Sequence, residues 1–77
     1  MTLQERLRTL RTHIGLSIEK MSNELTENGY SITFKTISGY ENAFRQPSVQ
    51  FLTGLTNVYD ANPNWLLTGN GEIFLNK

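Results

Sequence analysis

Thr33-Phe34-Lys35-Thr36-Ile37-Ser38-Gly39-Tyr40-Glu41-Asn42, followed by Arg45-Gln46-Pro47-Ser48, is the stretch that decides the fold of this 77-residue chain. Thr33 is a good helix N-cap, and Ile37 and Tyr40 are three residues apart, so they lie on one face that can be buried. Pro47 blocks helix continuation because it lacks a backbone N–H donor. The stretch therefore predicts a short helix, capped by Thr33 or Ser31 and ending near Asn42, and then a loop over 43–47.

Two helices are predicted before this stretch. The first covers 2–14, begins at Thr2, ends at Gly15, and has apolar residues at helical spacing: Leu3, Leu7, Leu10 and Ile14. The second covers 18–27 after the N-cap Ser17, ends at Asn28-Gly29, and has its own apolar face: Ile18, Met21 and Leu25. The connector that follows holds the apolar residues Tyr30 and Ile32, so we expect it to pack on the body of the protein.

Two more helices are predicted after it. Ser48 caps a helix over 49–59 with Phe51 beside an apolar face that we expect to be buried and that is formed by Val49, Leu52, Leu55, Val58 and Tyr59. Gly54 within it indicates close approach of another backbone. Asn62-Pro63 begins a fifth helix, which ends at Gly69 and whose core residues are Trp65, Leu66 and Leu67. The chain is thus expected to be all-α, with five helices in a domain over 1–69 and a C-terminal tail over 70–77.

Composition limits the possible functions. Seven basic and seven acidic residues give zero net charge, which counts against nucleic-acid binding, although segment 31–48 holds Lys35 and Arg45 against Glu41 alone. The first helix adds Arg6, Arg8 and Arg11 against Glu5, so we expect a modest positive face. The absence of cysteine rules out disulfides and thiolate metal sites. No apolar run spans a membrane and no signal-peptide pattern is present, so a cytoplasmic location is expected.

The helical run from Ser17, followed by the stretch around Ile37, has the shape of a DNA-binding helix-turn-helix. Several segments match the Cro/repressor-type helix-turn-helix family, also called the XRE family, in the family's order. They are Arg6-Leu7-Arg8-Thr9-Leu10-Arg11, Gly15-Leu16-Ser17, Thr36-Ile37-Ser38-Gly39-Tyr40-Glu41, Arg45-Gln46-Pro47-Ser48 and Asn64-Trp65-Leu66-Leu67-Thr68-Gly69-Asn70-Gly71. The chain resembles this family over nearly its whole length, and its ending resembles that of phage and prophage repressors.

The resemblance implies a compact five-helix bundle of the lambda-repressor-like kind, with Thr33–Glu41 as the recognition helix. It also implies a partly buried, structural ion pair between Arg11 and Glu41. The chain departs from the family in its longer connector, Asn28 to Ile32, and in having Ile18 where a glutamine is common. Phe34 and Gly39 also stand where polar base-reading residues are usual.

The candidate DNA-binding residues lie on the recognition helix and on the loop after it: Thr33, Phe34, Lys35, Thr36, Ser38, Gly39, Asn42, Arg45 and Gln46. Lys35 is suited to donate to guanine in the major groove, or to a phosphate. Phe34 can contact a thymine methyl group or fill a hole beneath the connector, and we favour the second interpretation. Gly39 allows close approach of DNA or fits a helix crossing. Thr33, Thr36 and Ser38 either donate to DNA or cap and line their helix.

The resemblance also assigns the loop residues Asn42, Arg45 and Gln46 to phosphate contacts, which orient a protein on DNA without reading sequence. His13 is the only histidine, and it has no companion ligand for a metal. No arrangement of catalytic residues stands out, so an enzyme is not expected. Neither a cofactor nor a small-molecule ligand is implied by the sequence.

These observations predict a sequence-specific transcriptional regulator, of repressor type, that binds double-stranded DNA in a bacterial or phage-infected cell, at the nucleoid. A homodimer through the C-terminal region is expected, using Trp65-Leu66-Leu67, Phe51 and the apolar tail residues Ile73, Phe74 and Leu75, unless the tail lies on its own domain. Two alternatives remain. The fold can serve as a protein-interaction module with weak or no DNA binding, or the chain can be the N-terminal domain of a longer repressor.

Overall fold

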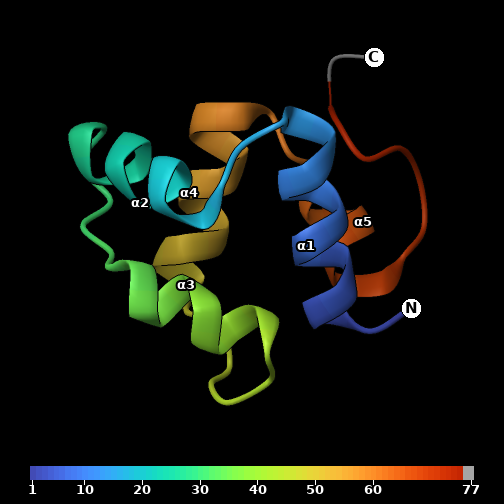
Figure 1. Cartoon of the computed structure of the whole chain (residues 1–77). Helices are drawn as coiled ribbons and strands as arrows, with labels where there is room; N and C mark the ends of the chain where they lie inside the picture. Colours follow the sequence, from blue (N-terminus) through green and yellow to red (C-terminus); the bar gives the residue numbers. More distant parts are fainter. Residues whose placement is uncertain (76–77) are drawn as a thin grey trace.

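Five α-helices follow one another along residues 1–75 (Figure 1). They are α1 (Leu3–Ile14), α2 (Ile18–Glu27), α3 (Phe34–Glu41), α4 (Val49–Tyr59) and α5 (Pro63–Thr68). The structure, a computed structural model, describes residues 1–75; the end of the predicted tail, 76–77, lies outside the described residues. The predicted all-α, five-helix bundle is confirmed, and each helix begins and ends within one residue of its predicted position.

A polar residue precedes every helix, and its side chain accepts a hydrogen bond from a backbone N–H of the first turn. These N-caps are Thr2, Ser17, Thr33, Ser48 and Asn62. Each one satisfies a donor that a helix start would otherwise leave without a partner. At α1 the cap is reciprocal, because the Thr2 N–H donates to Glu5 at 2.8 Å, and this bond lowers the pKa of the Glu5 carboxyl.

The core is built from all five helices. Helix α1 packs on α3 and α5, α2 packs on α3 and α4, and α4 packs on α5. The Tyr40 and Phe51 rings meet with centroids 4.8 Å apart, which joins α3 to α4. The fully or nearly fully buried apolar residues are Leu7, Leu10, Met21, Leu25, Ile37, Tyr40, Phe51, Leu55, Ala61, Trp65 and Leu66.

Two apolar residues that the sequence placed in the core are instead on the surface. Val49 is 80% exposed and Leu67 is 57% exposed. Val49 is the first residue of α4, at the end of its apolar face. Helix α5 has only six residues, and once Trp65 and Leu66 point inward, the next side chain is turned about 100° further round the helix. The core prediction was therefore wrong at both positions.

The lengthened connector between α2 and α3 packs on the protein, as predicted. The Tyr30 hydroxyl accepts a hydrogen bond from the Asn57 amide of α4 at 2.6 Å, and Ser22 of α2 donates to the Ile32 carbonyl at 2.8 Å. A Cβ at Gly54 would lie 2.9 Å from the Tyr30 ring. Gly54 thus makes room for a side chain of the connector, so the prediction that another backbone approaches it was wrong.

The described part of the tail lies against its own chain. The Asn62 N–H donates to the Ile73 carbonyl at 2.8 Å, and the Leu75 N–H donates to the Asp60 carbonyl at 2.8 Å. Ala61 and Phe74 form an isolated antiparallel bridge between these bonds. The tail was expected either to contact a second copy or to lie on its own domain. Residues 73–75 lie on their own domain. Within residues 1–75, no helix has the length and apolarity that crossing a membrane requires.

Candidate nucleic-acid interface

One side of α3 faces solvent along its whole length. Ile37 and Tyr40 point into the core, whereas Lys35 and Asn42 are exposed and Ser38 is half-buried. Lys35, Ser38 and Asn42 are spaced three and four residues apart, so they form one row, which we call the α3 ridge. In Figure 1, α3 and the loop after it form the lower edge of the molecule, and the C-terminal tail lies on the other side of α1 and α5.

Thr33 and Thr36 bond to each other at the start of α3. The Thr33 hydroxyl accepts from the Thr36 N–H at 3.2 Å, and the two hydroxyl oxygens are 2.9 Å apart. Thr33 therefore caps α3, as predicted, and Ser31 does not. Each hydroxyl keeps some capacity for a further bond.

Phe34 does not fill a hole beneath the connector. It is the first residue of α3, and it is 52% exposed, whereas Tyr30 and Ile32 occupy the space against the core. The interpretation that Phe34 packs inside was therefore wrong. Its ring is half-exposed at the N-terminal end of α3, where it is open to a ligand.

Gly39 is buried beneath the side chain of Arg45. The carbonyl of Gly39 accepts from the N–H groups of Phe44 and Arg45, at 2.9 and 3.2 Å. A Cβ at Gly39 would lie 3.3 Å from Cδ of Arg45. The space left by the missing side chain is thus filled by the stem of Arg45. Gly39 is a supporting residue for Arg45, and neither of the two predicted reasons for this glycine describes its surroundings.

Replacing Gly39 by alanine is expected to stabilise the protein and, on the proposal made below that Arg45 contacts DNA, to weaken DNA binding. Alanine favours a helix over glycine, so the free energy of unfolding should rise by about 0.5 kcal/mol. The new methyl group would push the Arg45 stem outward by a few tenths of an ångström. Urea denaturation and DNA titration measure the two effects. In an Arg45→Ala background, Gly39→Ala should keep its stabilising effect and lose its effect on DNA, and a persistent loss there would contradict this explanation.

The loop over 42–47 continues the ridge. Asn42 ends α3 and its amide donates to the Ser38 hydroxyl at 3.2 Å. Ala43 has a φ of 65°, which turns the chain back, and Arg45 and Gln46 are exposed. The sequence interpretation missed Phe44, which is 85% exposed. The sequence did indicate this exposure, because Phe44 stands alone among small and polar loop residues and belongs to no apolar helix face.

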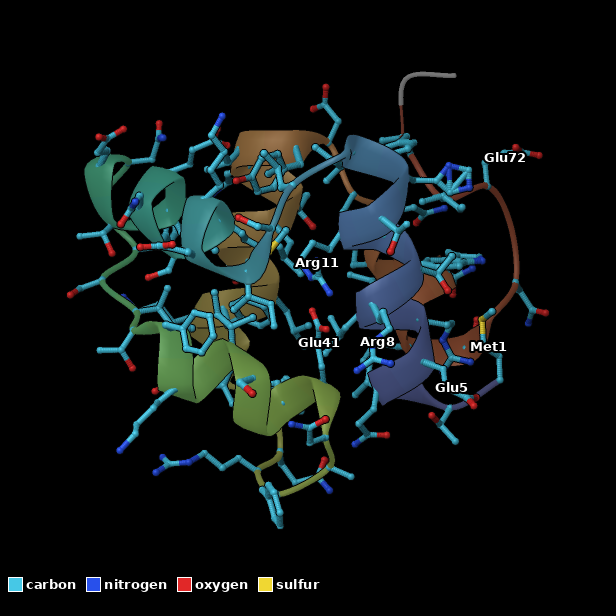
Figure 2. The ribbon with its side chains drawn as sticks, viewed as in Figure 1. Met1, Glu5, Arg8, Arg11, Glu41 and Glu72 are labelled. Atoms are coloured by element: carbon cyan, nitrogen blue, oxygen red, sulfur yellow. The ribbon has the colours of Figure 1, made fainter. Side chains whose placement is uncertain are left out.

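Glu41 is buried and paired with Arg11, as the family resemblance implied. Nε and Nη2 of Arg11 donate to the two carboxylate oxygens at 2.8 and 3.0 Å, and the exposed fraction of the Glu41 side chain is 3%. The hydrogen bonds to Glu41 raise the pKa of the Arg11 guanidinium, although its partial burial opposes this. Figure 2 shows Arg11 and Arg8 reaching from α1 toward Glu41, and Arg8 lies 3.5 Å from it. The only acid of segment 31–48 is thus withdrawn from the surface.

The positive face expected on α1 is largely absent. Arg6 is buried, because its guanidinium donates to the carbonyls of Leu66 at 2.7 Å and Leu67 at 3.3 Å, and to the carbonyl of Met1. Arg11 is held by Glu41. Arg8 alone of the three arginines has a largely exposed side chain, at 61%. The exposed positive charge beside α3 is therefore that of Lys35, Arg45 and Arg8, because the one carboxylate of Glu41 cannot neutralise both Arg8 and Arg11.

The described residues bring together most of the predicted site. The exposed members lie at the N-cap of α3, on α3 itself and on the loop that follows it: Thr33, Phe34, Lys35, Asn42, Arg45 and Gln46. Thr36 and Ser38 are half-buried, and Gly39 is covered. No group of three or more His, Cys, Asp or Glu residues within 1–75 is arranged to hold a metal ion. Comparison of the chain with protein-family models, with curated proteins and with solved structures gives no match, so the family resemblance rests on the residues quoted above.

Proposed function

We propose that this protein is a sequence-specific DNA-binding transcriptional regulator, a repressor of phage or prophage type, that places α3 in the major groove. One observation carries the proposal. The α3 ridge and the loop after it present Lys35, Asn42 and Arg45 to solvent, while Glu41 is buried against Arg11. A polyanion approaching this side meets hydrogen-bond donors and the exposed cations Lys35 and Arg45, and no exposed carboxylate of segment 31–48.

The residues divide into two roles. Lys35 stands near the start of α3, where the recognition helix of such proteins meets base edges, and its ammonium group is suited to the acceptor oxygen and nitrogen of guanine. Asn42, Arg45 and Gln46 stand beyond the other end of the helix and are suited to phosphate contacts. Ser38 lies between them. Thr33 and Thr36 can still donate from the hydroxyls that cap α3.

A second copy of the chain would bind through α4 and α5. Neither helix contains a charged residue, and their exposed apolar side chains, Val49 and Leu67, border a groove lined also by Leu52, Thr53, Thr56, Asn57 and Pro63. Phe51, Trp65 and Leu66 are buried in the core, so the proposed dimer depends on Leu67 and not on them. Two copies would set their recognition helices about 34 Å apart, one turn of the duplex. Such a dimer would act in the cytoplasm by occluding a promoter, without chemistry or a cofactor.

Replacing Lys35 and Arg45 one at a time tests these roles. Lys35→Ala should relax the sequence preference of binding, because it removes a base contact. Arg45→Ala should weaken binding to preferred and scrambled duplexes alike, and should reduce the salt slope by about 1 because one phosphate contact is lost. Fluorescence anisotropy at several salt concentrations measures both, with a duplex selected by the wild-type protein from a randomised library.

The two variants are matched, since each removes one exposed positive charge. If Lys35→Ala and Arg45→Ala changed affinity equally for every duplex, the base-reading role of Lys35 would be wrong. If the wild-type protein bound no duplex even at low salt, the regulator proposal itself would fail.

The second candidate function is a protein-interaction module. The uncharged surface of α4 and α5 favours it, as does the zero net charge of the chain. Ile18 also favours it, because its hydrocarbon side chain packs partly against the core and cannot form a hydrogen bond to DNA. Salt separates the two functions. DNA binding through phosphates weakens steeply as salt rises, whereas an apolar protein contact changes little.

A further inference from the structure

Phe44 is the most exposed of the large apolar side chains in the part of the chain that the structure describes, at 85%. A phenyl ring left in water forgoes the stabilisation that its burial would bring. The adjoining residues Ala43 and Arg45 are exposed too, so no neighbouring apolar surface shields the ring. The side chain does not serve the core, and its position beside the α3 ridge calls for a different explanation.

The backbone holds Phe44 in one place. Its N–H donates to the Gly39 carbonyl at 2.9 Å, and the Asn42 N–H donates to the Ser38 carbonyl at 2.9 Å. Ala43 adopts a φ of 65°, and Pro47 restricts the chain beyond. A ring presented on such a tight turn loses little backbone freedom when it meets a ligand, and this lowers the entropic cost of binding.

The chemistry around Phe44 favours nucleic acid as that ligand. Arg45 follows it directly, Lys35 lies on the same helix-and-loop surface, and Glu41 is buried. An interface with a protein normally needs a contiguous, well-packed apolar centre, which a single ring among Asn42, Arg45 and Gln46 does not supply. A duplex offers phosphates to the cations and, in the major groove beside them, the methyl groups of thymines to the ring.

We propose that Phe44 is a DNA contact that packs its ring against thymine methyl groups of the major groove, at the C-terminal end of the recognition helix. The proposal rests on the proposed function and adds to it a contact of a different kind. Arg45 and Lys35 contribute affinity that falls with salt, whereas the Phe44 ring contributes affinity that does not. Phe44 thus raises the affinity for duplex DNA of a protein whose net charge is zero.

The test compares Phe44→Ala and Phe44→Trp with the wild-type protein, on the duplex that the wild type selects from a randomised library. Phe44→Ala should weaken binding about tenfold, on the order of what burying part of a phenyl ring contributes. The slope of log affinity against log salt should stay as in the wild type, because no phosphate contact is lost. Phe44→Trp, which keeps an aromatic plane, should restore most of the affinity.

Leu75→Ala is the matched control, because Leu75 is also an exposed apolar residue, at 52%, and lies on the tail away from α3 (Figure 1). It should bind DNA as the wild type does. The thermal midpoint of Phe44→Ala should equal that of the wild type, since the ring is not part of the core. Wild-type affinity in Phe44→Ala would overturn the proposal and point to a protein partner for the ring. A loss of affinity with a reduced salt slope would also overturn it, by showing that the substitution acts through Arg45.

Failure of the proposed function gives a different result. If the wild-type protein bound no duplex at all, both proposals would fall together. If the wild type bound and Phe44→Ala bound equally well, only the role of Phe44 would be wrong, and the assignment of Lys35 and Arg45 would stand.

Discussion

Glu41→Gln is expected to lower the free energy of unfolding by about 3 kcal/mol, at the lower end of the range for breaking a buried ion pair. The carboxylate accepts two hydrogen bonds from Arg11 and is almost fully buried, while Arg8 lies at its edge. Glutamine fills the same space, so the loss comes from the charge and not from a cavity. Arg11 keeps its bond to the Leu16 carbonyl at 2.9 Å and some solvent contact, which limits the effect.

Glu27→Gln is the matched control, because it makes the same chemical change at an exposed position of α2. It should alter the free energy of unfolding by no more than about 0.5 kcal/mol. Urea denaturation followed by circular dichroism measures both variants. Equal stabilities of the two variants would show that the pair contributes nothing. The double variant Arg11→Met with Glu41→Leu should recover much of the loss, since an apolar pair avoids burying a lone charge.

Ile37→Ala is expected to cost about 2–5 kcal/mol, the range for truncating a fully buried aliphatic side chain. Ile37 has no exposed surface and is the aliphatic anchor of α3, whose other inward residues are Gly39, Tyr40 and Glu41. A folded chain of this length has about 4–12 kcal/mol of stability in total, so the variant should be partly unfolded at moderate temperature.

Ser38→Ala is the natural comparison, because it lies one residue further along the same helix and faces the surface. It should change the thermal midpoint only slightly, since its hydroxyl bonds only to the Asn42 amide. Differential scanning calorimetry of both variants compares their thermal midpoints. If Ile37→Ala had the same thermal midpoint as Ser38→Ala, the packing of α3 against α1 and α2 would not be what holds α3 in place.

Local sequence signals were enough to predict the helices. Each helix start has a side chain that bonds its own first turn, and such bonds join residues two or three apart, so they are visible in the sequence as caps. The left-handed glycines Gly15 and Gly69 mark two helix ends for the same local reason, with φ angles of 88° and 84°. Helical spacing identified most of the core, since Leu7 and Leu10 of α1, and Met21 and Leu25 of α2, are three or four residues apart and so share one face of their helix.

Long-range contacts decided what the sequence could not predict. Arg6 was counted as surface charge, because nothing near it in the chain reveals that the carbonyls of Leu66 and Leu67 will meet it. Gly54 gave a signal of close approach, but the identity of Tyr30 as its neighbour depends on how α2 and α4 cross. The candidate site was predictable as a segment. The exposure of Phe44 and the contact of Arg45 with Gly39 depend on the shape of the turn at Ala43.

The burial of Arg6 also has a consequence for how the chain folds. The guanidinium and the Leu66 carbonyl are 60 residues apart in sequence, so the bond closes a loop of nearly the whole chain. Closing so long a loop costs conformational entropy, and it comes late compared with local helix formation. During synthesis the arginine is made 60 residues before the leucine whose carbonyl accepts its bond. Until α5 has been made, Arg6 must remain hydrated, and α1 can complete its packing only when the end of the bundle is available.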